Sequence, residues 1–130
     1  MKRVLILCAC ALASFAFTAP APDGDVTMNG SYLWTYNNGK PGDLRAVFTP
    51  NGEGKFNVSF YFKFDGQNHT YTGTAEGSLD NGALKGSVTN ENKRRTFTFE
   101  GTCTNGKFEG NHAETTKGRA GRTGTMKLSK

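Results

Sequence analysis

The sequence predicts an all-β protein, a single antiparallel meander of eight strands that closes on itself as an up-and-down barrel. The 130 residues include 17 glycines and 15 aromatic residues, a composition that suits one small β domain with one core. Asn-Gly and Asp-Gly pairs, which favour tight hairpin turns, separate segments in which apolar and polar residues alternate. Alternation with a period of two places the large rings on one face of a sheet. A β-sandwich is the alternative way to bury that face.

The N-terminus has the pattern of a secretory signal peptide. Lys2 and Arg3 precede an almost wholly apolar run over 4–17, and small residues follow it. This run is short for a membrane span but typical of the apolar region of an export signal. We therefore expect a signal peptide over 1–19 and a single barrel domain over 20–130. The mature chain is expected to be secreted or periplasmic, with no membrane span.

Removal of the signal peptide takes away Cys8 and Cys10 and leaves Cys103 as the single thiol. One thiol forms no internal disulfide, so the domain is not a disulfide-stapled scaffold. We expect Cys103 to be a buried side chain that packs as a small hydrophobic group. The alternative for the N-terminus is a lipoprotein signal, with the chain lipid-anchored through Cys10.

The positive charge of the mature chain is concentrated near its C-terminus. Without Lys2 and Arg3 the chain has 14 basic and 11 acidic residues. Residues 20–92 contain five basic and eight acidic side chains, whereas residues 93–130 contain nine and three. One function class is therefore binding of a polyanion, such as an acidic envelope polymer, through the basic run over 117–122. Export and the modest excess of charge argue against nucleic acid as the partner.

The first two strands are expected over 28–36 and 43–49, joined by a loop that contains Asn38-Gly39. Large or apolar side chains occupy alternate positions in both segments. The inward side chains of these strands are expected to be Tyr32, Trp34, Tyr36, Ala46 and Phe48.

The third and fourth strands are expected over 55–64 and 67–79, with Asp65-Gly66 as the turn. A two-residue turn fixes the register, and here it pairs Phe62 with His69 and Phe60 with Tyr71. The predicted inward face of this hairpin consists of Phe56, Val58, Phe60, Phe62, Phe64, Tyr71, Ala75 and Leu79.

The fifth strand is expected over 83–89 after a two-residue turn at Asn81-Gly82. This turn would pair Leu79 with Leu84 and Gly77 with Gly86. Inward glycines weaken a strand, so each needs a local reason. We expect either a bend of the closing sheet or, at Gly86, room for the ring of Phe97.

The sixth strand is expected over 94–103, after a four-residue loop at 90–93 that pairs Val88 with Arg95 and Gly86 with Phe97. Its inward residues would be Phe97, Phe99 and Cys103.

The last two strands are expected over 107–113 and 122–129. The Asn105-Gly106 turn pairs Phe99 with His112, Cys103 with Phe108, and Gly101 with Gly110. The inward side chains of the eighth strand would be Met126 and Leu128.

The predicted architecture resembles the calycin class of barrels, which includes lipocalins and avidins. Eight meandering strands carry the resemblance, together with Gly30-Ser31-Tyr32-Leu33-Trp34 in the first strand. Lipocalins have Gly-x-Trp at this point, whereas here Tyr32 takes the Trp position and Trp34 follows two residues later. The resemblance implies binding of a small apolar ligand in the barrel mouth. Because the first strand departs from the lipocalin pattern, no ligand-binding residue of that family can be assigned to this chain.

The residues favour binding over catalysis. The two histidines lie 43 positions apart, and no spacing typical of a metal site or cofactor motif is present. Most carboxylates fall in turns or on the polar face, which does not favour a buried acid–base pair. We expect a protein that is not an enzyme and that requires neither a metal nor a cofactor.

The turns of a meander alternate between the two ends of the barrel, so the loops at 37–42, 65–66, 90–93 and 114–121 would share one end. We predict that this end is an open, basic, aromatic mouth that binds a small anionic or amphipathic ligand. The expected ligand-binding residues are Trp34, Tyr36, His69, Tyr71, Arg95, Phe99 and His112. At the opposite end, an apolar plug would form from Phe48, Phe56, Leu79, Leu84, Cys103 and Phe108. A structural surface module without a ligand is the alternative, in which the loop cations are solvated and both histidines form internal hydrogen bonds.

Overall fold

The computed structural model describes residues 24–35, 39–115 and 121–130, and within 121–123 it describes the backbone alone. The expected signal peptide, Cys10, Tyr36 and the basic side chains over 117–122 therefore lie outside the described parts. The eight strands are β1(Val26–Trp34), β2(Pro41–Pro50), β3(Lys55–Phe64), β4(Gln67–Gly77), β5(Gly82–Asn90), β6(Thr96–Thr104), β7(Lys107–Glu114) and β8(Gly121–Ser129).

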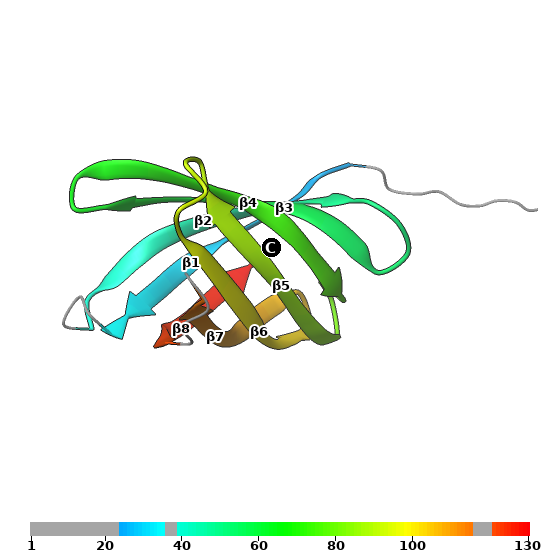
Figure 1. The fold of residues 1–130 in the computed structure, drawn as a ribbon. Helices are drawn as coiled ribbons and strands as arrows, with labels where there is room; N and C mark the ends of the chain where they lie inside the picture. Colours follow the sequence, from blue (N-terminus) through cyan, green and yellow to red (C-terminus); the bar gives the residue numbers. More distant parts are fainter. Residues whose placement is uncertain (1–23, 36–38, 116–120) are drawn as a thin grey trace, which may run out of the picture.

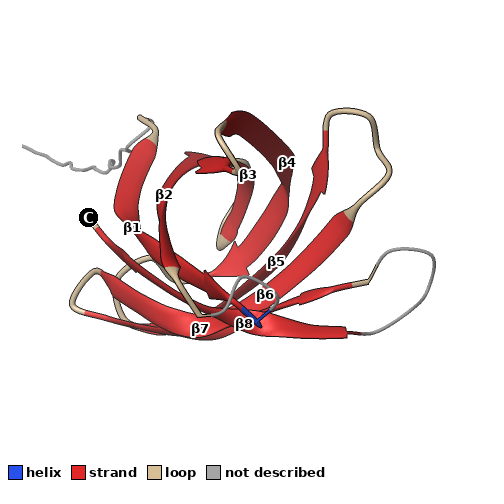
Figure 2. Ribbon diagram, turned by 90° about the vertical axis from the view of Figure 1, so that its left-hand side faces the viewer, coloured by secondary structure: helices blue, strands red, loops and turns tan. Residues whose placement is uncertain are grey.

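The strands form a closed antiparallel barrel in which each one pairs with its neighbours in chain order (Figure 1). The barrel closes between β1 and β8, where Asn29 pairs with Ser129 and Trp34 pairs with Gly124. The prediction of an up-and-down barrel is confirmed, and the sandwich alternative is excluded because no pair of free sheet edges remains. Figure 2 shows the strands curving around a common axis.

Two of the predicted hairpin turns have the expected geometry. Asp65 and Gly66 both have positive φ, at 54° and 77°, and Asn105 and Gly106 follow with 53° and 78°. This is the backbone of the two-residue turn that matches the twist of paired strands. The predicted pairs across these turns are confirmed: Phe62 with His69, Phe60 with Tyr71, Phe99 with His112, Cys103 with Phe108 and Gly101 with Gly110.

The predicted register of the β4–β5 hairpin was wrong by two residues. Gly77 pairs with Leu84 and Ala75 pairs with Gly86, so Leu79 is part of a longer loop. The hydroxyl of Ser78 accepts hydrogen bonds from the amides of Asp80 and Asn81 at 3.1 and 3.0 Å. These side-chain bonds stabilise a wider turn than the Asn-Gly pair alone predicts.

The register of the β5–β6 hairpin also differs from the prediction by two residues. Val88 pairs with Phe97, and Gly86 pairs with Phe99. The amide of Asn90 donates to the carbonyl of Arg95, so the loop begins one residue later than expected. The Asn90 side chain accepts bonds from the amides of Arg94 and Arg95 and holds this loop closed. Because both shifts are by two, no side chain changes face.

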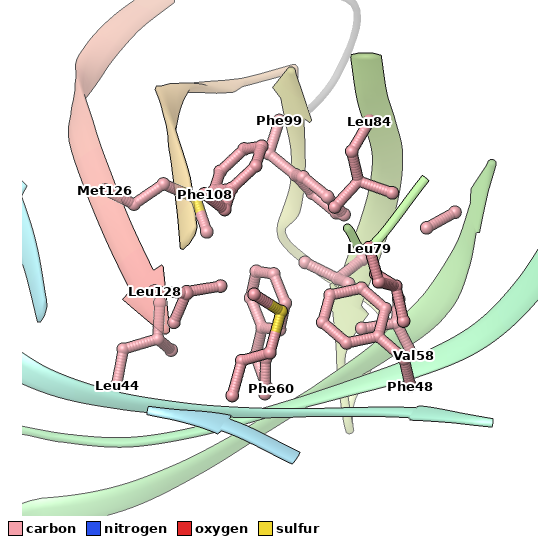
Figure 3. Packing of buried hydrophobic residues seen from close by; sticks show 14 of the residues in the cluster. Leu44, Phe48, Val58, Phe60, Leu79, Leu84, Phe99, Phe108, Met126 and Leu128 are labelled. Atoms are coloured by element: carbon pink, nitrogen blue, oxygen red, sulfur yellow. The ribbon is translucent and has the colours of Figure 1, made fainter. Parts of the chain in front are cut away.

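The core fills the barrel below the mouth with interlocking apolar side chains (Figure 3). The predicted plug is present at the closed end, where Phe48, Leu84, Cys103 and Phe108 are almost completely buried. Burial raises the pKa of the Cys103 thiol, as expected for a packed, unreactive cysteine. Met28 and Leu44 complete the core on β1 and β2. These two residues were not among the predicted inward side chains.

The inward glycines leave room for groups that approach them closely. A Cβ atom on Gly101 would lie 2.2 Å from the carbonyl oxygen of Glu109, so the neighbouring backbone of β7 approaches closely at this point. A Cβ atom on Gly86 would lie 2.6 Å from the ring of Phe99. The ring beside Gly86 is therefore Phe99 and not Phe97, because of the shifted register.

Candidate functional site

A cavity of about 80 Å³ opens at the end of the barrel where the β3–β4 and β5–β6 turns lie. Figure 2 views the molecule from this end. The cavity is lined by side chains from all eight strands or the loops next to them. They are Tyr32, Trp34, Leu44, Phe60, Phe62, Phe64, His69, Tyr71, Val88, Arg95, Phe97, Phe99, His112 and Met126.

The structure brings six of the seven predicted ligand-binding residues together around this cavity: Trp34, His69, Tyr71, Arg95, Phe99 and His112. The seventh, Tyr36, lies outside the described residues. The six differ in depth, since Tyr71 and Phe99 are buried whereas Trp34, His69, Arg95 and His112 are only partly covered. The expected site therefore has an inner apolar part and a more polar rim.

The wall of the cavity is a connected set of aromatic rings. Phe62 stacks against His69 with the ring centroids 5.4 Å apart, and its other neighbours are Tyr32 at 5.4 Å and Tyr71 at 5.3 Å. Phe97 continues the wall, because it contacts Tyr71 at 5.7 Å. Rings that hold one another at these distances keep their orientation, so the wall is largely preformed.

Gly42 leaves room for the side chain of Tyr32 to reach from β1 across β2 to β3. The Tyr32 ring lies over Gly42 in β2, where an added Cβ atom would be 2.5 Å from a ring carbon. Its hydroxyl then donates a hydrogen bond of 3.3 Å to the carbonyl of Lys63. Burial, followed by the charge of Asp43, raises the pKa of this phenol, so it stays protonated and remains a donor.

Among the described residues that line the cavity, Arg95 is the one Lys or Arg side chain, and its guanidinium is paired. Its Nε and Nη2 atoms donate to the two carboxylate oxygens of Glu114 at 3.1 and 2.9 Å. The same guanidinium lies 5.2 Å from the ring centroid of Trp34 and 5.5 Å from that of Phe97. The hydrogen bond to Glu114 is the main reason that the pKa of Arg95 is raised, although burial lowers it.

Glu114 is a residue of the site that the sequence did not predict, because a loop was expected over 114–121. In the structure β7 extends to Glu114, which pairs with Phe97 on the neighbouring strand β6. The signal was present in the alternation, since Glu114 follows Phe108, Gly110 and His112 at intervals of two. As a consequence, the carboxylate of Glu114 offsets the charge of Arg95, which is one of several cations expected at this end of the barrel.

His112 connects β7 to β1 across the glycine of the intervening strand. Its Nε2 lies 3.2 Å from the carbonyl oxygen of Leu33, so this nitrogen donates the bond. An added Cβ atom on Gly124 would lie 3.2 Å from the same nitrogen. Burial is the main cause of the lowered pKa of His112, and the backbone bonds partly oppose it.

This lowered pKa predicts that acid destabilises the barrel. The unfolded chain binds a proton at His112 below about pH 6.5, whereas the folded chain binds it only at lower pH. The free energy of unfolding is therefore expected to fall as the pH drops below about 6.5 and to stop falling below the folded pKa. Urea denaturation at several pH values measures this change.

Matched variants identify the group responsible. His112→Gln should flatten the pH dependence, whereas His69→Gln, which removes the other histidine, should retain it. An unchanged profile in His112→Gln would show that another group titrates.

Within residues 24–35, 39–115 and 121–130, no group of three or more His, Cys, Asp or Glu side chains is placed to hold a metal ion. In the same ranges, no helix has the length and apolar character that a membrane span needs.

Comparisons with protein-family models, with curated proteins and with solved structures find no match to this chain.

Proposed function

We propose that this protein is an exported, non-enzymatic binding domain that takes the apolar end of a small amphipathic ligand into the mouth of its barrel. The observation that supports this best is the cavity, whose wall contains eight aromatic side chains. Polar groups occupy the rim and apolar groups the inner end. Ligand pockets commonly combine an apolar wall with a few polar groups that orient the ligand.

The size of the cavity limits the ligand. At about 80 Å³ it is smaller than the roughly 150 Å³ cavity that holds a benzene molecule. It is also well below the roughly 300–1,000 Å³ of pockets for drug-sized molecules. The buried part of the ligand is therefore a short chain, and the rest of the molecule projects past the rim.

The architecture supports the same proposal. A closed, eight-stranded up-and-down barrel has room for one small ligand in its interior. We infer a calycin-like use of the mouth, in which Tyr32 and Trp34 both line the cavity despite the departure from the lipocalin pattern. The expected signal peptide over 1–19 supports export to the periplasm or the cell exterior.

A chain-length series tests the proposal. Straight-chain alcohols and carboxylates of roughly three to ten carbons should bind with affinity that rises by about 0.8 kcal/mol for each methylene buried. The rise should stop after a few carbons, because the cavity is small. Titration followed by Trp34 fluorescence, with calorimetry as a second method, gives the affinities.

A pair of matched variants locates the binding site. Val88 lines the cavity and is buried, so Val88→Leu should shorten the optimal chain by about one carbon. Val47 lies on the outer side of β2, and Val47→Leu should leave the series unchanged. If no chain length binds, or if both variants behave alike, the mouth is not a ligand site.

A further inference from the structure

We propose that Glu114 occupies the position of a ligand carboxylate on Arg95, so that the ligand is a small carboxylate and Glu114 is a built-in competitor that sets its affinity. This inference rests on the proposed function, because it assumes that the apolar end of the ligand enters the mouth. It adds the chemical class of the polar end and the residue that controls its binding.

The geometry of the Arg95–Glu114 pair is that of a guanidinium with a bound carboxylate. Two parallel N–H···O bonds join the guanidinium of Arg95 to the carboxylate of Glu114. This is the arrangement in which Arg binds a carboxylate most strongly and with a defined orientation. Arg95 lines the cavity, whereas Glu114 is not among the lining residues and approaches the guanidinium from the end of β7.

Arg95 also has contacts that hold it in place and do not depend on Glu114. Its guanidinium lies near the rings of Trp34 and Phe97, and both rings line the same cavity. Cation–π contacts of this kind keep a guanidinium in place. If the Glu114 carboxylate moves away, Arg95 can therefore stay at the rim and present the same donors to another carboxylate.

The Arg95–Glu114 pair is also accessible to solvent. The side chains of Arg95 and Glu114 are 38% and 23% exposed, so the pair is at the surface of the mouth. Because both side chains are partly exposed, water can solvate each of them once they separate. Exchange of one carboxylate for another on Arg95 keeps the guanidinium paired. A ligand whose apolar end fills the cavity gains the contacts that Glu114 does not make.

The test compares a carboxylate with a neutral ligand of the same chain length. Hexanoate and 1-hexanol are titrated into the full protein at about pH 7.5, where the carboxylate is ionised. The variants are Glu114→Gln, which removes the competing charge, and Glu109→Gln, which makes the same charge change on the outer face of β7. Thermal unfolding of each variant verifies that it is folded.

The expected result is that Glu114→Gln strengthens the binding of hexanoate by about tenfold and changes the binding of 1-hexanol less than about twofold. Glu109→Gln should change neither. The inference is overturned if Glu114→Gln leaves hexanoate binding unchanged or strengthens both ligands equally, which would mean that the ligand leaves the ion pair intact. Absence of binding by both ligands in every variant would instead reject the mouth site itself, and the inference with it.

An Arg95 variant supplies a second readout. Arg95→Met keeps an apolar stem against Trp34 and Phe97 but removes the donors. It should weaken hexanoate binding about tenfold and make the affinities of hexanoate and 1-hexanol similar. If Arg95→Met retains the preference for the carboxylate, another group binds it and the inference is wrong.

Discussion

Phe48→Ala is expected to destabilise the barrel by about 3–5 kcal/mol, the range typical of removing a fully buried phenylalanine. Phe48 has no exposed surface and lies in the plug at the closed end, where its ring contacts Phe56 with the centroids 6.1 Å apart. Its backbone pairs with both Val26 and Val58, which limits how far the surrounding strands can collapse into the space left behind. A domain of this size has a total stability of about 5–15 kcal/mol, so the loss is a large fraction of it.

Urea denaturation measures this effect, and Trp34 is a suitable probe because it lies at the opposite end of the barrel. A change in its fluorescence at the transition reports unfolding of the whole domain. Thermal unfolding should shift downward by roughly 15 °C. The control is Leu33→Ala, since Leu33 is a large apolar side chain with 39% exposure. This variant should lose no more than about 0.5–1 kcal/mol. Equal losses in the two variants would contradict the assignment of the plug as the main core.

Gly73→Ala is expected to have an effect of similar size through a different cause. A Cβ atom on Gly73 would lie 1.8 Å from the carbonyl oxygen of Ser87 and 2.9 Å from the Cα of Val88. These are backbone atoms of the paired strand β5, so no side chain can rotate away. The strands must separate, and the cost is expected to be roughly 3 kcal/mol or more, with loss of β4–β5 hydrogen bonds.

Gly24→Ala provides the matched control, because nothing lies within 4 Å of the added Cβ atom. It should leave the free energy of unfolding unchanged within about 0.5 kcal/mol. Amide exchange of β4 and β5 distinguishes a local from a global effect. If Gly73→Ala is as stable as the parent protein, the close approach of the two strands is not a requirement of the barrel.

The face of each strand could be predicted because it depends on local alternation. Successive side chains of a strand point to opposite sides, whatever the strand pairs with. For this reason Phe60, Tyr71 and Phe99 were correctly placed inside, even though the register of two hairpins was wrong. Both errors were shifts by two residues, and a shift by two preserves the face.

The two registers that were predicted wrongly, those of the β4–β5 and β5–β6 hairpins, depend on hydrogen bonds within the loops. The turn at Asp65-Gly66 has two central residues and little choice of geometry. At 78–81 and 90–95, by contrast, Ser78 and Asn90 use their side chains to bind backbone amides. Such bonds compete with the ladder, and sequence spacing alone does not reveal which will form.

In the candidate site, too, the features set by local alternation could be predicted, and those set by contacts between distant residues could not. Its aromatic residues follow from alternation and from the position of each strand end. The pairing of Arg95 with Glu114 joins residues 19 positions apart and depends on where β7 ends. The expectation of a basic mouth counted the cations at this end of the barrel, without the carboxylate that the barrel brings to Arg95.

The linear chain was enough to assign the fold class, the interior of the barrel and six of the residues that surround its opening, because the period of two and the Gly-containing turns act over only a few neighbouring residues. Closure between β1 and β8, the approach of strand backbones at Gly73 and Gly124, and the size of the cavity were decided only by the folded barrel. They depend on the bending of the sheet and on packing between segments distant in the chain. The pairing of Arg95 with Glu114 belongs to this second group, since it joins residues 19 positions apart.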